Sequence, residues 1–144
     1  MKSTIILCSG GARSGKSEFA EQLALSLKGR KAYVATGQAF DDEMKDRIKK
    51  HQLRRGSEWI NFEIPRDLHD NWKQINKVSD IVLIDCLTMF TSNHFFSCGE
   101  IDSQEDANHV ESVILTELRL LLQDIKNSDN KTVIFVTNEI GLGI

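Results

Sequence analysis

The residues Gly10-Gly11-Ala12-Arg13-Ser14-Gly15-Lys16-Ser17 match the pattern G-x-x-x-x-G-K-[ST] at every specified position. The apolar, β-branched run 4–8 precedes them, and apolar residues at helical spacing follow as far as Gly29. In a loop of this kind, glycines let successive backbone N–H groups point at phosphates, and the following helix adds its positive N-terminal end. We therefore predict that this loop binds the phosphates of a nucleoside triphosphate, with Lys16 at the β- and γ-phosphates and Ser17 on Mg²⁺.

Beyond the loop, short apolar stretches alternate with segments of helical period. We predict strands at 4–8, 32–35, 59–64, 80–85 and 132–136, and helices at about 15–29, 41–56, 67–76, 87–96 and 105–127. The apolar stripes of the first and last helices include Phe19 and Val113, which we expect to pack inward. This alternation predicts an α/β fold of the P-loop NTPase (RecA-like) type, with three layers and a mostly parallel central sheet.

Length and composition favour a single nucleotide-binding domain over residues 1–144. A formal net charge of −3 argues against nucleic acid as a partner, and no apolar run is long enough to span a membrane. The three cysteines show no CxxC spacing, so neither a disulfide framework nor a zinc site is expected. We expect a cytoplasmic protein.

Asp85 ends a second apolar strand, where a carboxylate of a P-loop protein would approach Mg²⁺. Taken alone this is weak, because many strands end in Asp simply where a turn begins. The preceding loop makes a role for Asp85 at the metal the favoured interpretation.

The predicted helix at 41–56 is strongly basic around a single histidine. Between residues 45 and 55 six cations, Lys45, Arg47, Lys49, Lys50, Arg54 and Arg55, face one anion, Asp46. His51 shares a stripe with Met44 and Ile48, and neutral histidine can act as a nucleophile toward phosphorus. From these residues alone, a solvated basic helix with a chance histidine stays the stronger interpretation.

Several separated segments are similar to the bifunctional family of adenosylcobinamide kinase and adenosylcobinamide-phosphate guanylyltransferase, from cobalamin biosynthesis. They are the loop 10–17, Tyr33-Val34-Ala35-Thr36-Gly37-Gln38, Asp41-Asp42-Glu43-Met44, Arg47-Ile48-Lys49-Lys50-His51 with Arg55 and Trp59, Asp85-Cys86-Leu87-Thr88 with Asn93, and Thr137-Asn138-Glu139-Ile140-Gly141-Leu142-Gly143-Ile144. The resemblance spans the chain, and it reverses the interpretation of His51 as a chance residue.

The resemblance implies two reactions. In the first, a hydroxyl of adenosylcobinamide takes the γ-phosphate of ATP or GTP. In the second, His51 takes GMP from GTP, with release of pyrophosphate, and passes it to adenosylcobinamide phosphate, which gives adenosylcobinamide-GDP. We predict that Lys16 and His51 are catalytic, that Ser17 and Asp85 bind Mg²⁺, and that Thr36, Arg47, Glu63 and Asp85 contact the nucleotide together with the loop. A homo-oligomer, a trimer, is implied by the resemblance alone.

The chain departs from the family in two places. Gly56 stands where the family usually has proline, and the family continues past Ile144 with a further helix and strand. We therefore expect a chain truncated at its C-terminus, with some apolar surface uncovered.

Two other functions remain open from the residues. A different small-molecule P-loop kinase would use Lys16 and Ser17 but leave His51 idle. A non-catalytic, nucleotide-dependent regulatory module is the second, although Asn76-Lys77-Val78-Ser79 lacks the aspartate of a guanine-binding NKxD motif.

Overall fold

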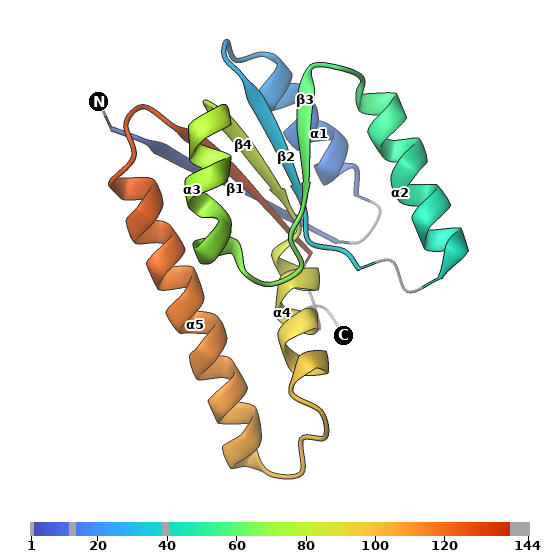
Figure 1. The fold of residues 1–144 in the computed structure, drawn as a ribbon, viewed down its shortest axis with the longest axis vertical. Coiled ribbons are helices and arrows are strands. Elements are labelled where there is room, and N and C mark those ends of the chain that lie inside the picture. The colour runs from blue at the N-terminus through green and yellow to red at the C-terminus, as the bar shows by residue number, and fades with distance from the viewer. Residues whose placement is uncertain (1, 12–13, 39–40, 139–144) are drawn as a thin grey trace.

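The computed structural model describes residues 2–11, 14–38 and 41–138, and a five-stranded, all-parallel sheet forms its centre (Figure 1). The strands are β1 (Thr4–Gly10), β2 (Lys31–Ala35), β3 (Trp59–Glu63), β4 (Ile81–Asp85) and β5 (Thr132–Asn138), in the spatial order β1-β5-β4-β2-β3. The helices are α1 (Lys16–Leu25), α2 (Asp42–Arg55), α3 (Leu68–Val78), α4 (Leu87–Ser97) and α5 (Gln104–Lys126). The predicted α/β class with a parallel sheet is confirmed.

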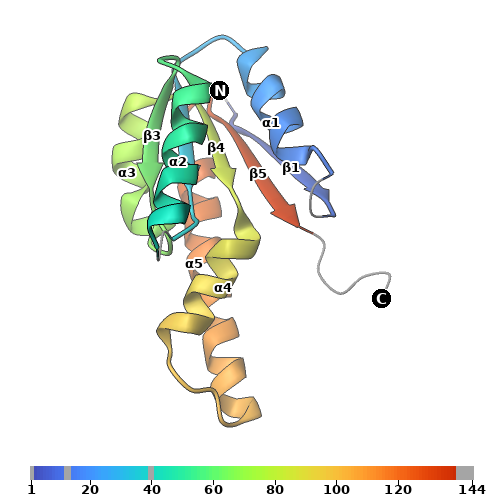
Figure 2. The same cartoon turned by 90° about the vertical axis from the view of Figure 1, so that its right-hand side faces the viewer.

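The helices cover the two faces of the sheet unequally. Helix α1 packs on one face through a cluster that includes Ala20 and Ala24, and α2 lies on the same side. Helices α3, α4 and α5 pack on the other face around Leu68, Phe90 and Leu121. Helix α4 and the N-terminal half of α5 extend past the end of the sheet (Figures 1 and 2).

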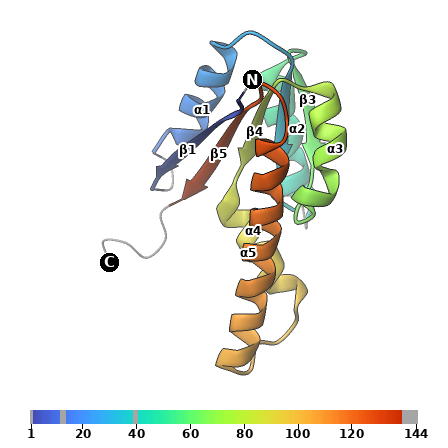
Figure 3. The same cartoon turned by 90° about the vertical axis from the view of Figure 1, so that its left-hand side faces the viewer.

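The central strands read as continuous apolar runs because both of their faces are buried. Along β4, Val82 and Ile84 belong to the cluster beneath α3 and α5, whereas Ile81 and Leu83 belong to the cluster beneath α1. In the view from the left-hand side of Figure 1, β1 forms one edge of the sheet next to β5 (Figure 3).

Two side chains that were expected to pack inward are exposed. Phe19 is 63% exposed and Val113 is 40% exposed, so both predictions were wrong. Helix α1 approaches the sheet through alanines, and Phe19 lies one position away from them, at the rim of a cavity shared with Arg54 and Arg55. Val113 borders a second cavity, between α3 and α5.

The carboxyl ends of the strands meet at one edge of the sheet because all five strands are parallel. Ala35 at the end of β2 is in register with Glu63 on β3 and with Asp85 on β4. In-register neighbours point to the same face of a sheet. Glu63 and Asp85 therefore lie at one level, on the side that carries α1 and α2.

At the opposite edge, Asp80 joins the starts of β2 and β4. Its carboxylate accepts hydrogen bonds from the backbone N–H of Arg30 at 2.8 Å and from the guanidinium of Arg30 at 3.2 Å. These bonds from Arg30 lower the pKa of Asp80 to about 2. Gly29 has a φ of 135°, and a Cβ there would come within 2.9 Å of the Asp80 Cβ, so this junction requires glycine.

We expect Asp80→Asn to destabilise the protein in a pH-dependent way. The pKa of Asp80 is lower in the folded chain than its ordinary value of about 3.9, so the charged form stabilises the fold above about pH 4. That contribution is lost as the pH falls toward 2. Urea unfolding should therefore show a difference in free energy between wild type and Asp80→Asn that is constant from pH 7 to 5 and clearly smaller at pH 3.

Glu111→Gln, on the exposed side of α5, is the charge-matched control. A difference for Asp80→Asn that stays the same from pH 7 to pH 3 would contradict the role of the carboxylate.

Candidate active site

The glycine-rich loop leaves β1 at Gly10 and enters α1 at Lys16. Gly15 has a φ of 82°, in the left-handed region, and caps α1 with no side-chain hydrogen bond to the helix N–H groups. A Cβ on Gly10 would lie 2.9 Å from the Ser14 hydroxyl, so a larger residue there would force the Ser14 side chain to move. The Lys16 ammonium donates to the Gly11 carbonyl at 3.0 Å. The N-terminus of α1 is thus open toward a ligand, as an anion site requires.

Helix α2 forms the wall opposite this loop. Its N-cap is Asp41, whose carboxylate accepts from the Met44 N–H at 2.7 Å. His51 and Arg54 project from α2 toward the loop and line a cavity of about 390 Å³ together with Ser14, Gly15, Lys16, Ser17 and Glu18. The fold therefore brings the predicted nucleophile next to the predicted phosphate site.

A smaller cavity of about 240 Å³ joins the same histidine to Asp85. Ser17, Tyr33, His51 and Arg55 line it as well. The hydroxyl of Ser17 and the carboxylate of Asp85 are oxygen ligands, which Mg²⁺ prefers, and Mg²⁺ typically binds one or two protein oxygens together with substrate phosphates. These two residues fit a nucleotide-bound Mg²⁺, and their role as metal ligands stays a prediction.

The carboxylate of Asp85 accepts a hydrogen bond from a tyrosine on the neighbouring strand. The Tyr33 hydroxyl donates to Oδ2 of Asp85 at 2.5 Å. Burial and then the negative charge of Asp85 raise the pKa of Tyr33 far above its ordinary range, so the phenol stays protonated and remains the donor. The guanidinium carbon of Arg55 lies 3.5 Å from the centre of the Tyr33 ring.

The other residues predicted to contact the nucleotide outside the loop do not line the two cavities beside His51. Thr36 is fully buried, and its hydroxyl donates to the Cys86 carbonyl at 2.6 Å and accepts from the Cys86 N–H, so this side chain holds β2 to the end of β4. Arg47 is exposed on α2 and is absent from the residues that line the cavities of His51. Ala12 and Arg13 lie outside the described residues.

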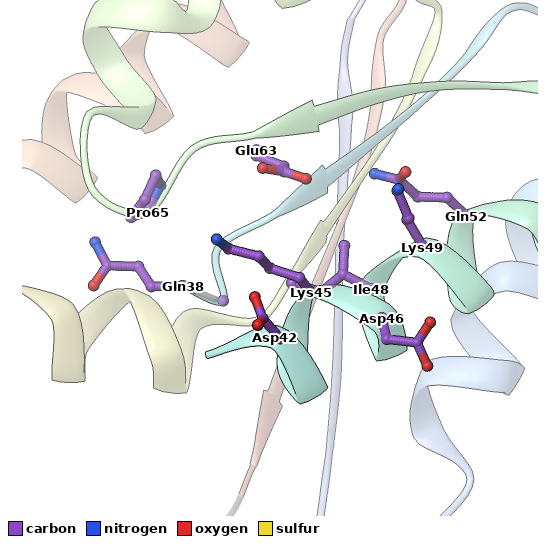
Figure 4. A pocket seen from close by; sticks show the side chains of 10 residues that line it. Gln38, Asp42, Lys45, Asp46, Ile48, Lys49, Gln52, Glu63 and Pro65 are labelled. Carbon is purple, nitrogen blue, oxygen red and sulfur yellow. The ribbon is translucent and has the colours of Figure 1, made fainter. Parts of the chain in front are cut away.

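Glu63 borders a large cavity, of about 880 Å³ (Figure 4). This cavity lies between the ends of β2 and β3 and the N-terminal part of α2, and it is lined by Gly37, Gln38, Asp42, Lys45, Asp46, Ile48, Lys49, Gln52, Glu63 and Pro65. Ile48 also borders the cavity of His51 and Asp85, so the two spaces adjoin along α2.

Sequence reasoning missed Tyr33, Arg54 and Glu21 at this site. Arg54 follows His51 by three positions, so helical spacing alone could have placed it on the same face. Tyr33 gave no such signal, because its partner Asp85 is fifty-two positions away in the chain. Glu21 forms ion pairs with Arg54 at 3.6 Å and Arg55 at 3.8 Å, which depend on how α1 and α2 meet.

A parallel sheet with a glycine-rich loop between β1 and α1 defines a P-loop nucleotide-binding protein. Two solved structures share this fold. One is a prototypical ATPase from the type III secretion system of pathogenic bacteria, with a TM-score of 0.61 and 12% identity over 97% of this chain and 44% of that one. The other is the RadB recombinase, with a TM-score of 0.57 and 21% identity over 94% of this chain and 61% of that one. At these identities the likeness shows the fold alone.

The chain belongs to the cobinamide kinase / cobinamide phosphate guanyltransferase family, whose pattern matches residues 6–144. It is 36% identical to the bifunctional adenosylcobalamin biosynthesis protein CobU of Escherichia coli (strain K12) over 97% of this chain and 77% of that protein. It is 35% identical to CobP of Pseudomonas aeruginosa over 94% of this chain and 71% of that protein. The family predicted from the sequence is confirmed, and with it an enzyme of cobalamin biosynthesis.

We expect Lys16→Gln to weaken GTP binding about 10- to 100-fold, because a hydrogen bond from a charged group contributes roughly 1.5–3 kcal/mol. Isothermal titration calorimetry with GTP and Mg²⁺ measures this. Lys28→Gln removes an exposed cation beyond the end of α1 and serves as the matched control. Equal affinities of wild type and Lys16→Gln would contradict a phosphate-binding role for Lys16.

Proposed function

We propose that the loop and α2 form one nucleotide site that serves both reactions of the family, phosphorylation of adenosylcobinamide and transfer of GMP to the phosphorylated product. The observation that carries this proposal is the cavity shared by Lys16, Ser17 and His51. A phosphate-binding loop alone would support only a kinase. A histidine opposite the loop adds a nucleophile within the same enclosure.

In the kinase reaction, the hydroxyl oxygen of adenosylcobinamide attacks the γ-phosphorus of ATP or GTP. The bond to the β–γ bridging oxygen breaks, the nucleoside diphosphate leaves, and the hydroxyl proton passes to solvent. Lys16 and the N–H groups at the start of α1 stabilise the negative charge on the β- and γ-phosphates.

In the guanylyl transfer, a neutral imidazole nitrogen of His51 attacks the α-phosphorus of GTP. The bond between the α-phosphorus and the bridging oxygen breaks, and pyrophosphate leaves. A phosphate oxygen of adenosylcobinamide phosphate then attacks the same phosphorus, which releases His51 and forms adenosylcobinamide-GDP. Arg54 borders the cavity beside His51 and is placed to bind the transferred phosphate.

Ser17 and Asp85 would hold Mg²⁺ beside the phosphates. The metal ion supplies positive charge that neutralises the phosphate oxygens. Glu63 we assign to the nucleotide as well, since it borders the large cavity that adjoins the cavity of His51 along Ile48. Thr36 and Arg47 remain proposed contacts of the nucleotide. Thr36 would make this contact through its backbone, which follows the end of β2.

A homo-oligomer, a trimer by family resemblance, and a cytoplasmic location complete the proposal. Exposed Ile5 and Leu7 on the edge strand β1 are compatible with an interface. Within the described residues, no helix is long and apolar enough to cross a membrane. Light scattering on the purified protein measures the oligomeric state.

We expect wild-type protein incubated with Mg²⁺ and GTP labelled at the α-phosphate to retain one label per chain, and His51→Ala to retain none, because the proposed transfer runs through a bond between His51 and the α-phosphorus. Intact mass spectrometry measures the added GMP. His109→Ala, an exposed histidine on α5, is the control and should label like wild type.

The kinase reaction of His51→Ala, followed with ATP labelled at the γ-phosphate, should persist. Labelling of His51→Ala at the wild-type level would rule out His51 as the nucleophile. No labelling of wild type would favour a P-loop kinase that leaves His51 idle.

A further inference from the structure

We propose that Tyr33 is a positioning residue, which orients the Asp85 carboxylate so that its other oxygen faces the phosphate loop. The proposal rests on the proposed function of Asp85 as a ligand of nucleotide-bound Mg²⁺. The contacts among five neighbouring elements, β2, β4, α2, β3 and α1, support it.

The contact between Tyr33 and Asp85 crosses adjacent strands. Tyr33 on β2 is in register with Leu83 on β4, so its side chain extends two residues toward the carboxyl end to reach Asp85. Tyr33 is only 8% exposed. Its hydroxyl donates to Oδ2 of the carboxylate, and Tyr33, Asp85 and Ser17 line the same cavity.

The ring of Tyr33 is held from two sides. Arg55 lies over one face, with its guanidinium carbon 3.5 Å from the ring centre, and Trp59 meets the ring edge to face at a centroid distance of 5.9 Å. Both contacts stabilise the ring in one place. The hydroxyl therefore has little freedom to follow a moving carboxylate, and Asp85 must adopt the orientation that Tyr33 sets.

Arg55 is itself fixed by polar contacts. Its side chain is 5% exposed, it donates to Asn61 at 3.0 Å, and it lies 3.8 Å from the carboxylate of Glu21. Arg55 ends α2, the helix that carries His51. The chain of contacts from Glu21 through Arg55 and Tyr33 thus joins α1 and α2 to Asp85.

A partner of this kind, which holds a metal-binding carboxylate without touching the metal, typically accounts for 10- to 100-fold in metal affinity. Within the described residues, Tyr33 forms no hydrogen bond with the loop or with Lys16. Loss of the hydroxyl should therefore weaken the metal-dependent part of nucleotide binding and leave the metal-independent part unchanged.

The test is calorimetric binding of the GTP analogue with a methylene group between the α- and β-phosphates, which cannot transfer GMP, in EDTA and in saturating Mg²⁺. Tyr33→Phe keeps the ring and removes only the hydroxyl. We expect it to bind like wild type in EDTA and to lose about tenfold or more of the affinity that Mg²⁺ adds. Ser128→Ala, which removes a buried hydroxyl bonded to Trp72 and to the Asp124 carbonyl, is the control for general destabilisation and should keep the full Mg²⁺ effect.

Asp85→Asn distinguishes the role of Asp85 as a metal ligand from the role of Tyr33 in orienting Asp85. If Asp85→Asn loses the Mg²⁺ effect and Tyr33→Phe keeps it, Asp85 is a metal ligand and the positioning role of Tyr33 is overturned. If Asp85→Asn keeps the Mg²⁺ effect, the proposed function of Asp85 fails, and the role of Tyr33 fails with it. A loss in both variants, without a loss in Ser128→Ala, supports the proposal.

Discussion

The common direction of the five strands is the constraint on which the rest of the structure depends. Parallel strands place every strand-to-helix loop at one edge, so residues far apart in the chain meet there. The register of Ala35 with both Glu63 and Asp85 puts two carboxylates at one level, on the two strands that flank β2. The phosphate loop enters from β1, which is separated from β4 only by β5. The strand order thus brings together the residues that we propose to bind the nucleotide and the metal ion.

The helix that carries His51 is attached more loosely than the others. No apolar side chain of α2 is buried, whereas α3 and α5 each bury three or more. Of the ion pairs that α2 forms with Glu21, the one from Arg54 involves a half-exposed guanidinium and contributes little. Arg55, whose side chain is nearly buried, attaches the C-terminal end of α2 to the sheet through Tyr33 on β2 and Asn61 on β3. Segments with few buried contacts open at low cost in free energy, which suits a wall that must admit a substrate.

Local patterns in the sequence were enough to predict the elements and the phosphate loop. The spacing of apolar residues within each segment indicates a strand or a helix, and the loop residues are contiguous. Neither prediction therefore needs tertiary information. The side chains that depend on how elements meet were harder. Phe19 and Val113 have the spacing of buried residues but lie beside cavities, and Arg54, not Arg47, shares the cavity of His51. The pairing of Tyr33 with Asp85 requires the order of the strands, which periodicity does not contain.

The two reactions of the family occur at different phosphorus atoms of the nucleotide, and we propose that both use one cavity. Phosphoryl transfer requires the acceptor at the γ-phosphorus, whereas the proposed guanylyl transfer places His51 at the α-phosphorus, yet the same loop would hold the phosphates in both. A nucleotide that occupies the loop excludes a second one, so the reactions at this site must follow one another. If a histidine holds the GMP covalently, pyrophosphate can leave the loop before the acceptor binds. The exposure of His51 on α2, beside the cavity, is consistent with this sequence of events, because the guanylylated side chain must be reachable by a bulky corrinoid.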